Sequence, residues 1–121
     1  MSALTIANHD RLHRNRLTTL ACHHLAKMLE DNQILSYLNI SDNRVGNEGL
    51  KNIMKGLSPQ SPLVVLNLTN NELDGPPAVE HLFGYLRNNK NLLELNLSNN
   101  RIGDNALKQM SSLFEENASS I

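Results

Sequence analysis

The sequence predicts an α/β solenoid, a right-handed coil in which short strands alternate with helices. The first observation is a motif, L-x-x-L-x-[L/I]-x-x-N, that occurs at residues 35–43, 63–71 and 92–100, so its copies begin 28 and 29 residues apart. A period of this length indicates one strand–helix unit per repeat. The second observation is an apolar stripe at spacing i, i+3, i+7 after each motif, which is typical of a helix with one buried face. The third is an aromatic content of only 3%, so the core is almost purely aliphatic and suits the stacking of similar units.

Composition limits the class of protein. A chain of 121 residues is long enough for one domain, which we expect to span residues 1–121. The net charge of −1 gives no reason to expect a nucleic acid or an anionic membrane as partner. The single cysteine, Cys22, excludes an intramolecular disulfide and favours a reducing compartment. No long apolar run and no leader pattern is seen, so we expect a cytoplasmic protein.

Residues 1–34 are predicted to form a degenerate first unit. Leu4-Thr5-Ile6 matches the strand pattern Leu66-Asn67-Leu68, but His9 stands where the later units carry the motif asparagine. A helix is expected from about Asn15 to Glu30. Its apolar stripe would consist of Leu17, Leu20, Ala21, Leu25, Met28 and Leu29.

Three regular units are predicted to follow, at residues 35–62, 63–91 and 92–116, with a polar, frayed tail at 117–121. Proline residues end the second unit and begin the helix of the third, because proline is tolerated only in the first turn of a helix. Asp104 is expected to cap the last helix. The predicted strands are Tyr37 to Ser41, Val65 to Thr69 and Glu94 to Ser98. The helix of the second unit is expected at about Glu48 to Leu57. The apolar stripes of the helices in the second, third and fourth units are, in that order, Leu50, Ile53 and Leu57; Val79, Leu82 and Leu86; and Leu107, Met110 and Phe114.

The motif asparagines Asn43, Asn71 and Asn100 are predicted to be structural. Both leucines of L-x-L point to one side of a strand and enter the core, and the chain turns at the asparagine. A carboxamide offers two donors and an acceptor oxygen, so stacked copies can satisfy buried backbone groups of neighbouring turns. A small residue before each stripe (Gly49, Ala78 and Ala106) would let the helix approach the strands closely.

The segments LNISDNRVGNEGL, LNLTNNELDG and LNLSNNRIGDNAL resemble leucine-rich repeats. The period and the long helix are similar to the ribonuclease-inhibitor-like class. This resemblance implies a short, right-handed, curved solenoid with parallel strands on the concave face and helices on the convex face. It covers residues 35–116 well and residues 1–34 weakly, and it identifies a fold more than a function.

The residues between the buried leucines should face outward on the concave sheet and form a protein-binding surface. Tyr37, Val65 and Glu94 make the most variable column, with Tyr37 as an aromatic anchor. We therefore expect a non-enzymatic scaffold or adaptor that binds a protein partner and needs no cofactor or metal. The asparagine and Ser/Thr columns are more simply explained as residues typical of the repeat. The residues predicted to bind are Tyr37, Val65, Glu94, Asn39, Asn67, Asn96, Ser41, Thr69 and Ser98.

Two further functions are open from the sequence. The strands near Leu4 and at Glu94 to Ser98 should both be sheet edges, so the chain could be a structural subunit that associates through its ends or helices. Ran GTPase-activating proteins resemble this repeat class, so an enzyme-regulating role is a third hypothesis. No catalytic constellation or phosphate-binding loop is present, and nothing identifies residues for that activity.

Three local features have ordinary explanations. The cluster His9, Arg11, His13, Arg14 and Arg16 could bind an acidic partner but is more simply a solvated turn. Cys22-His23-His24 suggests zinc, yet adjacent helical residues point about 100° apart and no second ligand pair is evident. Glycosylation sequons at Asn39, Asn67 and Asn96 follow from the repeat itself, and that at Asn117 lies in the tail.

Overall fold

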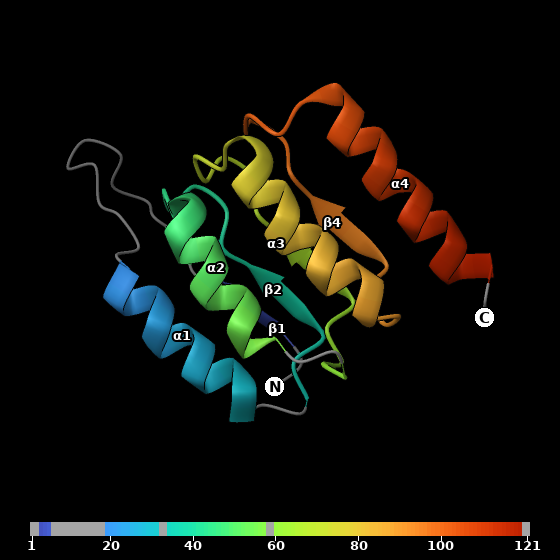
Figure 1. Ribbon diagram of the computed structural model, residues 1–121. Helices are drawn as coiled ribbons and strands as arrows, with labels where there is room; N and C mark the ends of the chain where they lie inside the picture. Colours follow the sequence, from blue (N-terminus) through green and yellow to red (C-terminus); the bar gives the residue numbers. More distant parts are fainter. Residues whose placement is uncertain (1–2, 6–18, 32–33, 58–59, 120–121) are drawn as a thin grey trace.

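The computed structural model describes residues 3–5, 19–31, 34–57 and 60–119. In chain order it contains β1 (Ala3–Thr5), α1 (Thr19–Asp31), β2 (Tyr37–Asn39), α2 (Gly46–Gly56), β3 (Val65–Asn67), α3 (Gly75–Asn88), β4 (Glu94–Asn96) and α4 (Asp104–Ser119). The strands form one parallel sheet in the order β1-β2-β3-β4, and the helices lie side by side across one face of that sheet (Figure 1). The α/β solenoid predicted from the sequence is confirmed.

The strands are aligned residue for residue. Tyr37 pairs with Val65, and Val65 pairs with Glu94, so the three lie in one row across the sheet. Ala3 extends the row onto β1 by pairing with Tyr37. The same alignment gives a row of leucines, Leu4, Leu38, Leu66 and Leu95, and a row containing Thr5, Asn39, Asn67 and Asn96. Repeat spacing in the sequence therefore becomes adjacency in space.

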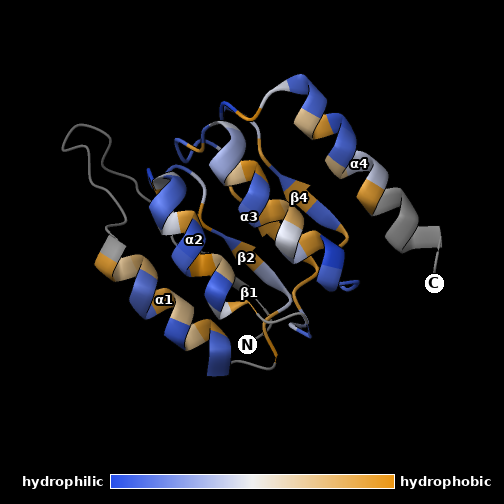
Figure 2. Cartoon of the chain, viewed as in Figure 1, coloured by the Kyte–Doolittle hydropathy of each residue, from blue (hydrophilic) through white to orange (hydrophobic). Residues whose placement is uncertain are grey.

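The core lies between the sheet and the helices. Leu38 and Leu66 on the strands and Leu50 and Ile53 on α2 are each 0% exposed. Hydrophilic and hydrophobic residues alternate along each helix in Figure 2. Neighbouring strands are about 4.8 Å apart whereas packed helices need about 8–10 Å, so the sheet takes the inner, concave side of the coil.

Each predicted strand in the regular units is two residues shorter than expected. The backbone turns into the left-handed region just beyond the strand, at Asp42 (φ 63°), Asn70 (φ 55°) and Asn99 (φ 58°). Asparagine and aspartate tolerate this conformation better than other residues with a side chain. Hydrogen bonding continues past the strand ends, because the Ile40 N–H donates to the Asn67 carbonyl at 3.1 Å.

The buried face of α1 differs from the predicted stripe. Leu20 is 65% exposed and Met28 is 45% exposed, whereas Cys22 and Ala26 are buried together with the expected Leu25 and Leu29. The reason is the close approach of α2. A Cβ added at Gly56 would meet the Ala26 carbonyl oxygen at 2.4 Å, so the two helices meet through small residues.

Several helix boundaries also differ. Helix α2 begins at Gly46, and α4 begins at Asp104 itself and continues to Ser119, beyond the predicted end at Glu116. In the α4 stripe Met110 is buried, but Leu107 is 41% exposed because no helix of the described part packs beyond α4. Asn15, Leu17 and the basic cluster at residues 9–16 lie outside the described residues, as does the side chain of Phe114.

Candidate functional site

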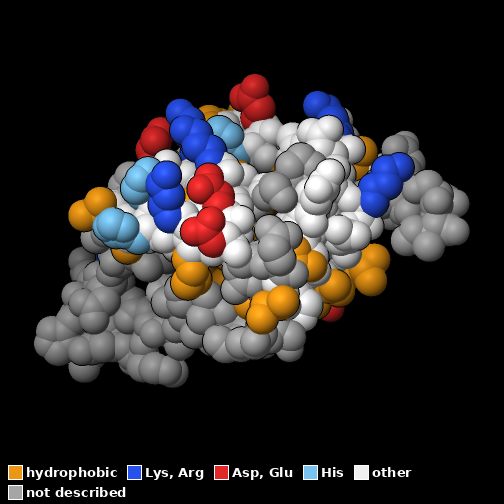
Figure 3. Space-filling model, turned by 90° about the horizontal axis from the view of Figure 1, so that it is seen from below, with side chains coloured by type: hydrophobic (Ala, Val, Ile, Leu, Met, Phe, Trp, Pro, Cys, Tyr) orange, Lys and Arg blue, Asp and Glu red, His pale blue; other side chains and the backbone are white. Residues whose placement is uncertain are grey.

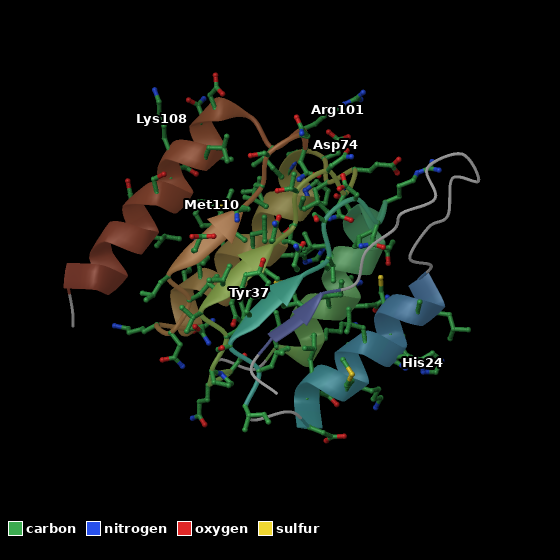
Figure 4. All side chains as sticks on the ribbon, turned by 180° about the vertical axis from the view of Figure 1, so that it is seen from behind. His24, Tyr37, Asp74, Arg101, Lys108 and Met110 are labelled. Carbon is green, nitrogen blue, oxygen red and sulfur yellow. The ribbon has the colours of Figure 1, made fainter. Side chains whose placement is uncertain are left out.

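The sheet face, as we name the side of the sheet opposite the helices, brings together the first predicted column. Tyr37 and Val65 are partly exposed and Glu94 is exposed, while the intervening Leu38 and Leu66 are fully buried. This alternation follows from the pleat of a strand. Figure 4 shows the sheet from this side, with Tyr37 on β2 and no helix of the described part in front of it. An aromatic ring, an isopropyl group and a carboxylate are therefore neighbours on three adjacent strands.

The predicted asparagine column is partly used by the protein itself. The Asn39 Oδ1 accepts the Ser41 N–H at 2.9 Å, and the Asn67 Oδ1 accepts the Thr69 N–H at 3.0 Å. Because a backbone N–H requires an oxygen as acceptor, these contacts identify the Oδ1 of both amides and leave Nδ2 as the donor atom of each. On β4 the Asn96 Nδ2 donates to the Glu94 Oε2 at 3.1 Å. Ser41 and Thr69 are partly exposed and Ser98 is exposed.

The motif asparagines form a hydrogen-bonded ladder inside the coil. Asn71 is 0% exposed, and its Oδ1 accepts the N–H groups of Asn43 at 3.1 Å and Val45 at 3.3 Å. Its Nδ2 donates to the carbonyls of Ile40 at 3.0 Å and Thr69 at 3.2 Å. One carboxamide thus satisfies four backbone groups in two consecutive units.

The next rung of the ladder repeats the pattern. The Asn100 Oδ1 accepts the N–H groups of Asn71 and Leu73, both at 2.9 Å. Its Nδ2 donates to Leu68, Leu97 and Ser98 carbonyls at 2.9, 3.1 and 3.3 Å. The third and fourth units are therefore each hydrogen-bonded to the preceding unit, which makes this part of the sheet face rigid.

Polar side chains also join successive units along the loops that follow the strands. The Asn70 Nδ2 donates to the Asp42 Oδ1 at 2.7 Å, and the Arg44 Nε donates to the Glu72 Oε1 at 2.8 Å. The Arg44–Glu72 pair is exposed at 40% and 49%, so water screens it and its contribution to stability is small. These loops border the sheet face and hold its edge in register.

A groove between α2 and α3 on the helical side was not foreseen from the sequence. It encloses about 580 Å³ and is lined by Lys51, Met54, Lys55, Leu57, Glu80, His81, Gly84, Tyr85 and Asn88. Tyr85 is 8% exposed, and its hydroxyl has no hydrogen-bond partner among the described residues. Burial raises the pKa of this hydroxyl above its ordinary 10.0. In the repeat pattern Tyr85 takes the position of Gly56, and that exchange of a small for a large residue is the only signal the sequence offers.

Charged side chains and histidines gather mostly in the upper part of the view in Figure 3, and hydrophobic side chains mostly in the lower part. Polar and apolar side chains are thus partly separated on this face of the molecule.

Asn89 is a further polar residue that the motif did not identify. It is 0% exposed, its Oδ1 accepts the N–H groups of Asn91 at 2.8 Å and Leu92 at 3.0 Å, and its Nδ2 donates to the Ser61 carbonyl at 3.2 Å. It therefore ties the end of α3 to the preceding unit. The repeated asparagines of the segment NNKN were the available signal.

The Cys22-His23-His24 segment separates its three side chains. Cys22 is buried at 0% exposure, whereas both histidines are exposed with their ring centroids 6.2 Å apart. Within the described ranges no three His, Cys, Asp or Glu residues are grouped so that they could hold a metal ion. His81 is partly buried along the groove between α2 and α3.

The sequence matches a family model of the leucine-rich repeat over residues 31–54 and 88–111. It is 35% identical over 101 residues to ribonuclease inhibitor of Sus scrofa, a match that covers 83% of this chain. The chain belongs to the leucine-rich-repeat family. Its repeats are of the ribonuclease-inhibitor-like class, as the sequence predicted. This leucine-rich-repeat chain is also 39% identical over 89 residues, 73% of its length, to NACHT, LRR and PYD domains-containing protein 3 of Rattus norvegicus.

The leucine-rich-repeat chain spans only part of these relatives, 22% of ribonuclease inhibitor and 8% of the rat protein. Among solved structures it is similar to the tropomodulin C-terminal domain of Caenorhabditis elegans, with a TM-score of 0.67 over 99% of this chain and 86% of that chain. Their 16% sequence identity makes this a likeness of fold. Leucine-rich-repeat proteins generally mediate protein–protein interaction. None of the described helices combines the length and apolar character required for a membrane span.

Proposed function

We propose that this chain, acting as a single repeat domain, is a non-enzymatic interaction module that binds a protein partner against the sheet face. The observation that carries the proposal is the row Tyr37, Val65 and Glu94, which three adjacent strands hold in register with side chains accessible to a partner. The tyrosine in this row supplies a large contact area at a low cost in side-chain entropy.

Rigidity supports the proposal. The asparagine ladder fixes the third unit to the second and the fourth to the third, so the row from Tyr37 to Glu94 is ordered before a partner arrives. A preformed surface loses little conformational entropy on association, and more of the contact energy remains as affinity. One relative, ribonuclease inhibitor, is named for its action on another protein.

The chemistry of the row indicates the kind of surface that would fit. Tyr37 and Val65 favour an apolar or aromatic patch, and Glu94 beside them favours a lysine or arginine at the border of that patch. The amide donors of Asn39 and Asn67 favour carbonyl or carboxylate acceptors. The fully buried thiol of Cys22 is compatible with a reducing compartment, and we place this adaptor in the cytoplasm.

Affinity capture from a lysate of the source organism tests the proposal. The wild-type chain is compared with a Tyr37→Asp, Glu94→Lys double variant, which reverses the chemistry of the row. A matched control, Asn88→Asp with Glu80→Lys, makes the same charge changes at exposed positions of α3 on the helical side. Circular dichroism establishes that all three proteins are folded.

We expect the wild type and the α3 control to capture the same protein and the sheet-face variant to lose it. Loss in the α3 control alone would move the site to the groove between α2 and α3. Equal capture by all three proteins would show that the sheet face is not used.

A further inference from the structure

Two positions of the repeat shape the groove between α2 and α3. At the first, Gly56 lets α2 reach the backbone of α1, since an added Cβ would lie 2.4 Å from the Ala26 carbonyl oxygen. The equivalent position of α3 carries Tyr85, whose buried side chain lines the groove. The neighbouring Gly84 is exposed, and a Cβ added there would meet nothing within 4 Å. The floor that the tyrosine forms is therefore left uncovered on the α3 side.

The rim of the groove carries an excess of positive charge. Lys51 and Lys55 stand four residues apart on α2, so they lie on one face of the helix with their Cβ atoms about 6 Å apart. Both side chains are exposed, and neither forms an ion pair with a described residue. Glu80 on α3 is the one acidic side chain among the described residues that line the groove. The two lysines are therefore available to pair with carboxylates of another molecule.

The floor of the groove is apolar except for one buried hydroxyl. Met54 and Leu57 of α2, together with the ring of Tyr85, supply the apolar part. The Tyr85 hydroxyl has no hydrogen-bond partner among the described residues, and a buried polar group without a partner costs free energy. A main-chain N–H or carbonyl group of a ligand, approaching past Gly84, would satisfy this hydroxyl.

The dimensions of the groove suit a short peptide. Its lining runs from Glu80 to Asn88 along α3, a length of about 12 Å, which about four residues of an extended chain would cover. The groove is open to solvent rather than enclosed, so a longer chain can pass through it. It lies between two interior helices that α1 and α4 flank, so it includes neither edge of the coil (Figure 1).

We propose that the groove between α2 and α3 binds an acidic peptide segment of a partner protein. Carboxylates of the segment pair with Lys51 and Lys55, and an apolar side chain packs against Met54 and the ring of Tyr85. A main-chain group bonds to the Tyr85 hydroxyl. The groove lies on the helical side, opposite the sheet face, so it is a second binding surface beyond the proposed function. Both surfaces can be occupied at the same time.

Binding of synthetic peptides to the full chain, followed in NMR spectra of the isotope-labelled protein, tests this proposal. The probe is a short capped peptide of glutamates around a central leucine. A peptide with lysine in place of every glutamate has the opposite charge and tests charge complementarity. Glutarate carries two carboxylates without a peptide chain, so it distinguishes a free organic anion from a peptide segment.

Two pairs of variants locate the site. Gly84→Leu places a side chain over the floor at a position where an added Cβ meets nothing, so the fold is preserved. Asn105→Leu adds the same side chain at an exposed position of α4 and is its control.

The second pair changes the charge of the rim. Lys51→Glu combined with Lys55→Glu reverses it. Lys27→Glu combined with Lys108→Glu makes the same change at exposed positions of α1 and α4, outside the groove. Circular dichroism establishes that every variant is folded.

We expect the glutamate peptide to shift the amide signals of residues that line the groove, with an affinity that falls as salt is added. Gly84→Leu and the reversed rim should each weaken binding by about tenfold or more, whereas the two controls should bind as the wild type does. The lysine peptide and glutarate should bind more weakly than the glutamate peptide. The sheet-face variant, Tyr37→Asp with Glu94→Lys, should retain full affinity, because its changes lie on the opposite side of the sheet.

Several outcomes would overturn the proposal. The absence of any shift at glutamate-peptide concentrations up to about 1 mM excludes the site. Full affinity in Gly84→Leu or in the reversed rim places the contact elsewhere, and loss in the sheet-face variant alone places it on the sheet face. Equal binding of the lysine peptide rejects an acidic ligand. Glutarate that binds as tightly as the glutamate peptide identifies a small organic anion as the ligand instead.

Discussion

Replacing Asn71 by alanine tests the ladder that connects the units. The side chain is fully buried and makes four hydrogen bonds to backbone groups of Asn43, Val45, Ile40 and Thr69. At a net value of about 1 kcal/mol for each bond, the substitution should lower the free energy of unfolding by about 4 kcal/mol. The loss is larger if water cannot reach the four groups that are left without a partner, because each then keeps its desolvation penalty.

Urea unfolding followed by circular dichroism measures this loss. With a slope of about 2 kcal/mol per M, the midpoint should fall by about 2 M while the slope is unchanged. Asn105→Ala is the matched control, because Asn105 is exposed on α4 and its substitution should change stability by less than about 0.5 kcal/mol. Asn100→Ala should lie between them, at about 2 kcal/mol, since water already reaches part of that side chain.

A loss below about 1 kcal/mol for Asn71→Ala, at an unchanged slope, would refute the reasoning. It would mean that water or a small backbone shift satisfies the four groups as well as the carboxamide does. A lower slope would instead indicate that the units no longer unfold together.

Three further predictions concern the helices and loops. Gly56→Ala should destabilise the protein by about 2 kcal/mol, because the added Cβ meets the backbone of α1. A Cβ added at Gly84 on α3 meets nothing within 4 Å, so Gly84→Ala should stabilise the protein by about 0.5–1 kcal/mol. Thermal unfolding of the two variants and the wild type measures both effects. Because burial holds the pKa of Tyr85 above 10.0, the titration of this hydroxyl leaves the free energy of unfolding unchanged well below pH 10 and lowers it as the pH rises from 10.0 through the folded-state pKa. At pH 7 the Tyr85→Phe variant should be equal in stability to the wild type or more stable by up to about 1 kcal/mol. Above pH 10 it should lose less stability than the wild type. Parallel curves of unfolding free energy against pH for the two proteins would contradict this prediction. A double-mutant cycle on the exposed Arg44–Glu72 pair should give a coupling below about 1 kcal/mol that falls with added salt, and a salt-independent coupling would show that the pair is not screened.

The position of a residue within the repeat predicted whether its side chain lies on the sheet face. Tyr37, Val65 and Glu94 stand at equivalent positions of the motif, so parallel strands in register had to place them in one row. Which of these residues contact a partner is not encoded in the motif, because the same pattern serves every leucine-rich repeat. The amides of Asn39 and Asn67 illustrate the difference, since part of their hydrogen-bonding capacity is used within their own strands.

The sequence by itself determined the strand–helix units, their register and the buried asparagine ladder. It could do so because a period of 28 or 29 residues forces equivalent positions to stack, and a buried backbone needs its hydrogen bonds satisfied. Only the tertiary structure decided which side of α1 is buried and how closely the helices pack. Leu20 and Met28 fit an apolar stripe as well as Cys22 and Ala26 do, but the close approach of Gly49 to Cys22 and of Gly56 to Ala26 selects the smaller pair. Helical periodicity offers several candidate faces, and the shape of the neighbouring helix chooses among them.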